Sequence, residues 1–206
     1  MNLKQVGAKS LRRWRYVLSQ LDRGERRALL AAAIDAILHP RRRDWRVPVR
    51  SATSFMFVFH GNIIRSPLAA AAFARETSSR GRSVQVTSAG LAARPGDPAD
   101  PRAIDSAEER GLDLESHRAR SLDTAQVASV GVIFVMDHLN LGRILKRFPA
   151  AADRVFLLGG CRPDGRVVLT EILDPVSGTL SDVRVTHNEL AAATRLVASA
   201  LDLPRP

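Results

Sequence analysis

Cysteine is nearly absent from this sequence of 206 residues, which contains only Cys161. No intrachain disulfide can form, and zinc sites built on a cysteine pair are excluded. Aromatic residues make up 5% of the chain, so few side chains exist to stack on an aromatic ligand. No apolar run approaches the roughly 18 residues of a membrane-spanning helix, and the N-terminus lacks an apolar signal core. We therefore expect a cytoplasmic protein.

Positive charge is concentrated at the N-terminus. The formal net charge is +10, but residues 1–50 carry 13 Lys and Arg against 4 Asp and Glu, and the rest of the chain carries 18 against 17. This asymmetry indicates a nearly neutral globular body with a cationic arm.

The basic segment contains two amphipathic helical patterns, separated by DRGE. Their apolar residues recur at spacings of three and four, and are Leu11, Trp14, Leu18 and Leu21, then Leu29, Leu30, Ala33, Ile34 and Ile37. The stretch HPRRRDWRVPVR (39–50) combines arginines with two prolines, which is typical of a linker or a docking strap. We place a boundary near residue 52. Residues 1–52 then form a basic helical extension, and residues 53–206 form the main domain.

The main domain alternates apolar strands with helices. The predicted strands are 54–59, 83–88, 130–136 and 154–159, and the predicted helices are 67–81, 97–111, 138–148 and 180–201. Strands that are apolar almost throughout predict a single doubly wound α/β domain, with a four-stranded parallel sheet flanked by helices. Such sheets bind ligands at the carboxyl ends of their strands. The loop after the first strand leaves at that end.

That loop, HGNIIRSP (60–67), has the features of an anion-binding loop. Gly61 permits a tight turn, and Asn62 tolerates a left-handed conformation that points successive amides inward. Arg65 can make a two-pronged contact, and a helix beginning at Pro67 with Ser66 as its N-cap adds partial positive charge. The predicted phosphate-binding residues are His60, Gly61, Asn62, Ile63, Ile64, Arg65 and Ser66. The alternative is a tight turn that carries a surface arginine.

The stretch FVFHGNIIRSPLAA resembles the loop of the low-molecular-weight protein tyrosine phosphatases, which consists of a cysteine, five residues, an arginine and a serine or threonine. Further family-like stretches follow in order, and are VTSAG, GDPADPRA, GLDLESHRARSL, VIFVMD, FLLG and EILDPVSG. The resemblance covers residues 53–204. It implies the fold predicted above, and no metal or other cofactor is expected.

The resemblance also implies a mechanism. In the family the loop cysteine attacks phosphorus, the loop arginine stabilises the transferring group, and the aspartate of an Asp-Pro dipeptide protonates the leaving oxygen. Arg65 and Asp174 match the last two, and Ser66 matches the serine that stabilises the thiolate. The residues that match a network supporting the loop are Asn62, Ser88 and His117.

The nucleophile position is occupied by Phe59, whose benzyl group has no lone pair with which to form a phosphoenzyme. His60 could be phosphorylated, but neighbouring side chains on an extended loop diverge, so it should point away from the loop centre. Cys161 lies in the turn-rich stretch GGCRPDG and is expected to be an incidental surface or turn thiol.

Two further supports of catalysis are missing. Ile64 stands where the family has a second loop cysteine, and Val176 and Ser177 follow Asp-Pro where aromatic residues usually flank the substrate ring. The same lack of thiols argues against an arsenate reductase. The ring of Phe59 must either plug the loop or force it to rearrange, and Arg65 would then need Asp174 or Asp137 as its partner.

The leading hypothesis is a catalytically inactive phosphatase-like protein that acts as a binding or regulatory module, with a phosphorylated protein or a small anion as the ligand that fits the loop. The first alternative is a phosphatase with residual activity through a route that needs no cysteine. The second is docking through residues 1–50 on an anionic membrane or an acidic partner. Specific nucleic-acid binding is not expected, because no groove-reading motif is present.

Overall fold

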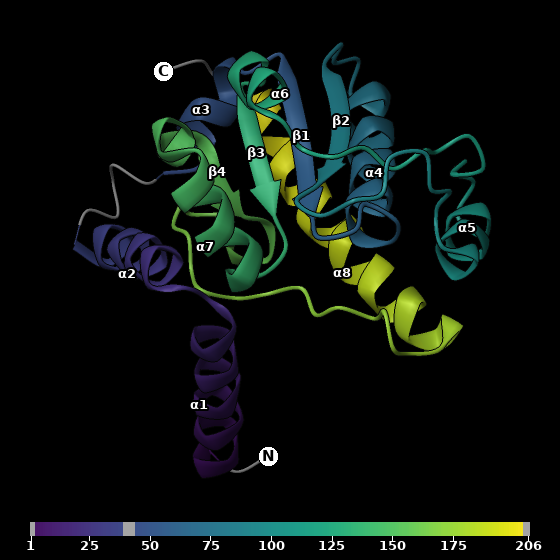
Figure 1. Ribbon diagram of the computed structural model, residues 1–206. Helices are drawn as coiled ribbons and strands as arrows, with labels where there is room; N and C mark the ends of the chain where they lie inside the picture. The colour runs from purple at the N-terminus through teal and green to yellow at the C-terminus, as the bar shows by residue number, and fades with distance from the viewer. Residues whose placement is uncertain (1–2, 39–43, 204–206) are drawn as a thin grey trace.

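The computed structural model describes residues 3–38 and 44–203, without the side chains of residues 3–11 and 37. Its centre is a four-stranded, all-parallel sheet in the order β2-β1-β3-β4 (Figure 1). The strands are β1 (Ser54–Phe59), β2 (Gln85–Gly90), β3 (Val132–Val135) and β4 (Val155–Leu157). The predicted α/β architecture is confirmed.

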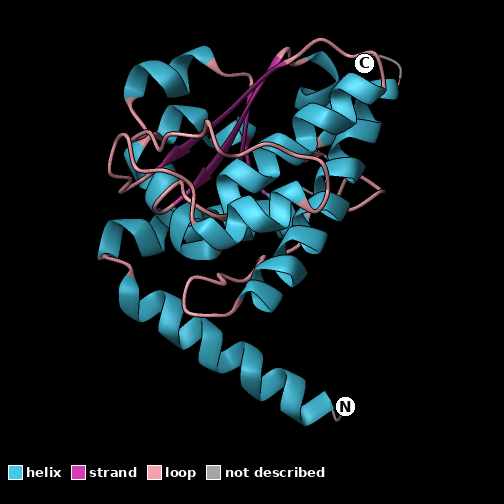
Figure 2. Cartoon of the chain, turned by 90° about the vertical axis from the view of Figure 1, so that its right-hand side faces the viewer, coloured by secondary structure: helices cyan, strands magenta, loops and turns pink. Residues whose placement is uncertain are grey.

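Helices cover both faces of the sheet, as Figure 2 shows from the side. They are α1 (Leu3–Gln20), α2 (Arg23–Leu38), α3 (Arg46–Ser51), α4 (Arg65–Ser79), α5 (Pro101–Glu108), α6 (Thr124–Ser129), α7 (His138–Arg147) and α8 (Leu180–Ser199). None of the helices in the described ranges is long and apolar enough to cross a membrane.

Alternation along β1 divides the hydrophobic core into two halves. Phe55, Phe57 and Phe59 belong to the half covered by α3, α4, α5 and α8, whereas Met56 and Val58 belong to the half covered by α1, α2, α6 and α7. Successive side chains of a strand point to opposite faces, so an apolar run is what a sheet covered on both sides requires. Phe59 is the last residue of β1 and lies at the carboxyl edge of the sheet.

The two helices of the basic extension pack against the body. Val17, Leu21 and Leu29 are buried in the same half of the core as α7. The predicted apolar face of α2 is partly wrong, because Leu30 and Ile34 are exposed. The small side chains of Ala28 and Ala32 allow α2 to lie close to the body, so the buried face of the helix is centred on Leu29. The larger side chains of Leu30 and Ile34 therefore face outward. The side chains of the predicted positions Leu11 and Ile37 lie outside the described residues.

Two local predictions are corrected. The second part of the arginine-rich stretch is packed against the body as α3, with Trp45 and Val49 buried, while residues 39–43 lie outside the described part. Ser66 is not an N-cap, because α4 begins at Arg65 and its N-cap residue Ile64 makes no side-chain cap. The hydroxyl of Ser66 is instead occupied by an interaction within the loop.

Candidate functional site

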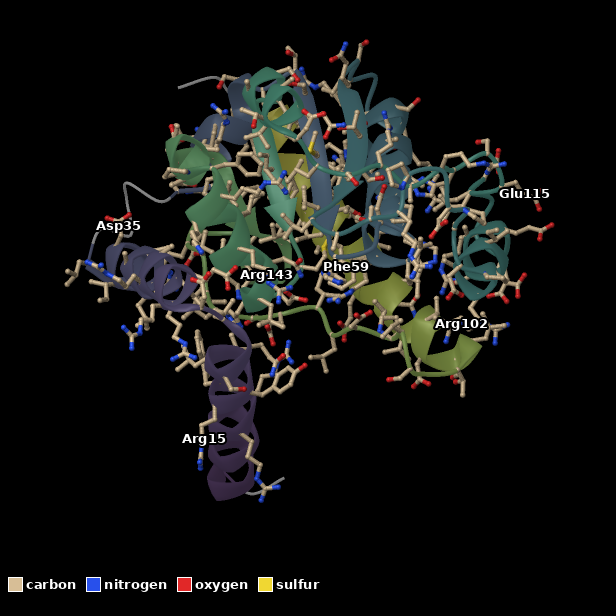
Figure 3. The ribbon with its side chains drawn as sticks, viewed as in Figure 1. Arg15, Asp35, Phe59, Arg102, Glu115 and Arg143 are labelled. Carbon is tan, nitrogen blue, oxygen red and sulfur yellow. The ribbon has the colours of Figure 1, made fainter. Side chains whose placement is uncertain are left out.

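Phe59 lies at the carboxyl edge of the sheet, near the centre of the molecule (Figure 3). Its side chain is 8% exposed and belongs to the hydrophobic core. The guanidinium carbon of Arg65 lies 3.4 Å from the centre of the phenyl ring. A cation at this distance over an aromatic face is attracted by the quadrupole of the ring. The ring therefore covers one face of the predicted phosphate-binding arginine.

The edges of the Arg65 guanidinium are also occupied. Its Nη2 lies 3.0 Å from Asp174 Oδ2 and 3.3 Å from Asp137 Oδ2, and its Nη1 donates to the Ile172 carbonyl at 2.6 Å. Burial lowers the pKa of Arg65 from its ordinary value, and the carboxylates of Asp174 and Asp137 act against this shift. Arg65 is 1% exposed, and two carboxylates and a phenyl ring surround its charge.

Asn62 organises the loop from a left-handed backbone conformation with φ of 57°. Its amide nitrogen donates to Ser66 Oγ at 3.0 Å and to Ser88 Oγ at 2.9 Å, and its Oδ1 accepts from the Arg120 backbone at 2.9 Å. Nε2 of His117 lies 2.7 Å from the Asn62 carbonyl, which can only accept, so Nε2 carries a proton. The structure thus brings together the residues predicted to support the loop.

The other loop residues frame this network. His60 is exposed, Gly61 and Ile63 are half-buried, and Ile64 is buried. The backbone amides of residues 61–64 find no acceptor within the described part of the chain. The end of β2 approaches the loop so closely that a Cβ on Gly90 would come 2.6 Å from the His60 carbonyl oxygen. The loop therefore presents unpaired backbone amides, within the described residues, of the kind that an anion-binding loop uses, and Phe59 precedes it.

The turn-rich surroundings of Cys161 predict a surface or turn thiol, and the surface alternative is wrong. It is 3% exposed and belongs to the core half that also contains Phe59. Burial raises the pKa of the Cys161 thiol well above its ordinary value. The reactive form of a cysteine is its thiolate, so burial makes Cys161 a poor nucleophile.

The segment that carries Asp174 is held by helix α1, which the sequence patterns did not indicate. Nε of Arg13 pairs with Glu171 Oε2 at 2.5 Å, and the backbone amide of His138 donates to Glu171 Oε1 at 2.8 Å. The Trp14 ring packs on the His138 ring with 4.5 Å between their centres. Burial by itself would raise the pKa of Glu171, but hydrogen bonds from His138 and Arg13 outweigh it and lower this pKa to about 2.

This pairing predicts a loss of stability in acid. The pKa of Glu171 in the folded state is about 2, below its ordinary value of 4.5, so its contribution is complete above pH 4.5 and is lost as the pH falls towards 2. Between about pH 6 and about pH 3, the free energy of unfolding of the native chain should fall by about 1 kcal/mol more than that of Glu171→Gln. The difference is small because Arg13 is partly exposed and water weakens the pair. Urea unfolding at both pH values measures this difference.

The exposed residue Glu115 provides the control for that experiment. Glu115→Gln should show the same loss of stability between the two pH values as the native chain. If Glu171→Gln and Glu115→Gln behave alike, Glu171 does not stabilise the contact between α1 and the Asp174 segment.

The sequence matches the model of the low molecular weight phosphotyrosine protein phosphatases over residues 54–203. The parallel sheet, the loop after β1 and this match together show that the chain belongs to the family of low molecular weight phosphotyrosine protein phosphatases. The probable low molecular weight protein-tyrosine-phosphatase EpsP of Ralstonia nicotianae is 38% identical over 106 residues, which cover 52% of this chain and 70% of that protein. The protein-arginine-phosphatase of Bacillus subtilis is 30% identical over 150 residues, which cover 73% of this chain and 97% of that protein.

A solved structure of the YwlE arginine phosphatase superposes with a TM-score of 0.69 at 30% identity, over 74% of this chain and 97% of that one. In that structure serine replaces a cysteine, and the active-site serine is phosphorylated. The relatives are therefore phosphatases, and in one of them a hydroxyl side chain in the active site carries phosphate.

Proposed function

We propose that this chain is a catalytically inactive member of the phosphatase family and acts as a binding or regulatory module. The observation that carries the proposal is the stacking of the Phe59 ring on the Arg65 guanidinium at 3.4 Å. A side chain without a lone pair stands at the nucleophile position, and it covers the group that would stabilise a transferring phosphoryl group. Asp137 and Asp174 both pair with Nη2 of the same guanidinium.

Other candidate nucleophiles are poorly suited to replace a loop cysteine. Cys161 is buried with a raised pKa, and His60 is exposed, as expected for a side chain that diverges from Phe59. Val176, which follows Asp174-Pro175, is exposed and aliphatic, so it offers no aromatic surface for a phosphotyrosine ring. A phosphorylated protein or a small anion would have to displace the Phe59 ring before it could reach Arg65.

The first test is hydrolysis of an aryl phosphate and of a phosphoarginine peptide by the purified full chain. We expect no turnover above the buffer rate for either substrate, because no phosphoenzyme can form at Phe59. The variants Asp174→Asn and Arg65→Lys should be equally inactive. Circular dichroism of each variant establishes that it is folded.

The competing hypothesis is residual phosphatase activity through directly activated water. It is compatible with Asp174, whose side chain is 33% exposed and therefore accessible to solvent. Turnover by the unmodified chain that is lost in both Asp174→Asn and Arg65→Lys would establish this activity and overturn the proposal. Insensitivity of that turnover to alkylating agents would show that no thiol takes part.

A further inference from the structure

Helix α2 presents a row of aliphatic side chains to solvent. Leu30 is 47% exposed, Ile34 is 54% exposed and Leu38 is 65% exposed. They are spaced by four residues, so at 3.6 residues per turn they lie within about 80° of one another around the helix. The opposite side of α2 is the one that packs on the body, through Leu29 and neighbouring alanines. The aliphatic row is therefore on the outer face of the helix. Figure 1 shows α2 at the edge of the molecule.

Arginines continue this row towards the start of α2. Arg23 and Arg27 fall in the same sector of the helix as Leu30, and both are exposed. Within the described residues, neither side chain makes an ion pair or a hydrogen bond. The carboxylates at this end of α2 are engaged elsewhere, since Asp22 pairs with Lys146 and Glu25 accepts from the Asp22 backbone. The outer face of α2 thus combines an exposed cationic end with an aliphatic row.

We propose that the outer face of α2, made of Arg23, Arg27, Leu30, Ile34 and Leu38, docks the protein on an anionic lipid surface. An interfacial helix buries aliphatic side chains at the boundary of headgroups and acyl chains, while its arginines bind anionic headgroups. The basic excess of residues 1–50 adds long-range attraction to the same surface. This docking is independent of whether Phe59 blocks catalysis.

A second copy of the chain fits this face less well than lipid does. A symmetric contact would bring together two faces that carry arginines and no carboxylate, so it would supply no counter-charge. A lipid surface supplies both the apolar depth and the negative charge.

The direct test is cosedimentation of the full chain with vesicles of phosphatidylcholine containing about 30% phosphatidylserine, and with vesicles of phosphatidylcholine alone. We expect binding to the anionic vesicles only, and at least a tenfold weaker binding when salt is raised from about 100 mM to about 500 mM. Equal binding to both vesicle types, or to neither, would overturn the proposal.

Variants separate the two parts of the surface. Leu30→Gln/Ile34→Gln and Arg23→Gln/Arg27→Gln should each reduce binding to anionic vesicles about tenfold or more. The matched controls are Val185→Gln, an exposed aliphatic residue on α8, and Arg94→Gln/Arg166→Gln, which removes the same charge from exposed positions elsewhere. Controls that lose as much binding as the α2 variants would contradict a specific docking face.

Two further outcomes assign the face to another occupant. Sedimentation equilibrium that shows a dimer in the native chain and a monomer in Leu30→Gln/Ile34→Gln would mean that a second copy covers the row. Charge alone would be responsible if Leu30→Gln/Ile34→Gln keeps full binding to anionic vesicles. In that case soluble polyaspartate should displace the native chain from the vesicles, and should bind the variant as tightly as it binds the native chain. Either result overturns lipid docking by this face.

Discussion

Phe59→Cys should hydrolyse aryl phosphates at least about a thousandfold faster than the unmodified chain, because removal of a catalytic nucleophile costs this much or more in enzymes that use one. The loop around position 59 keeps its backbone shape, with Asn62 held by four hydrogen bonds at 2.7–3.0 Å. A thiol there would begin the loop that leads into the N-terminus of α4, and the partial positive charge of a helix N-terminus favours a thiolate. Steady-state kinetics of the purified variant measures the gain.

Phe59→Ala is the matched control for this experiment. It removes the ring from Arg65 and opens at least as much space, but it adds no nucleophile. We expect Phe59→Ala to remain inactive, and iodoacetamide to abolish the activity of Phe59→Cys. Cys161→Ser in the Phe59→Cys background should leave the rate unchanged, because that thiol is buried. A Phe59→Cys protein no faster than Phe59→Ala would mean that more than the nucleophile has been lost from this site.

Asn62→Ala should lower the free energy of unfolding by about 3 kcal/mol. Two buried hydroxyls, those of Ser66 and Ser88, lose their partner, and so does the part-buried backbone amide of Arg120. A buried polar group without a partner is costly. Alanine at a φ of 57° adds a further conformational cost. Urea unfolding followed by circular dichroism measures the change.

Two comparisons make the Asn62 result specific. Asn62→Gly loses the same hydrogen bonds but accepts positive φ, so it should be about 1 kcal/mol less destabilised than Asn62→Ala. Asn188→Ala removes an exposed asparagine on α8 and should cost less than about 0.5 kcal/mol. If Asn62→Ala costs no more than Asn188→Ala, the network does not hold the loop.

Much of the fold followed from local patterns. The first strand was predicted at 54–59 and is β1 (Ser54–Phe59), because an apolar run followed by a glycine-containing loop has few alternatives. The outer face of α2 could not be predicted in this way. Helical spacing is satisfied by both Leu29 and Leu30, and only the position of α7 decides which of them is buried.

In the candidate site, too, some features could be predicted from the sequence and others only from the structure. Spacing and family resemblance predicted the loop, the residues that support it and the position of Phe59 at its start, and the structure brings these residues together. The Arg13–Glu171 pair joins residues 158 positions apart, and no local pattern marks either one as the partner of the other. The expected exposure of Cys161 was wrong because the turn that carries it folds back onto the core.

The sequence by itself determined that phosphorus cannot be attacked from position 59, because the chemistry of a benzyl side chain does not depend on where the chain places it. Only the tertiary structure decided what that side chain does. The ring stacks on Arg65, while Asp137, Asp174 and the Ile172 carbonyl, between 72 and 109 residues further along the chain, occupy the edges of the guanidinium. Packing of distant segments against one another selects these partners, and the periodicity of a single segment carries no information about them.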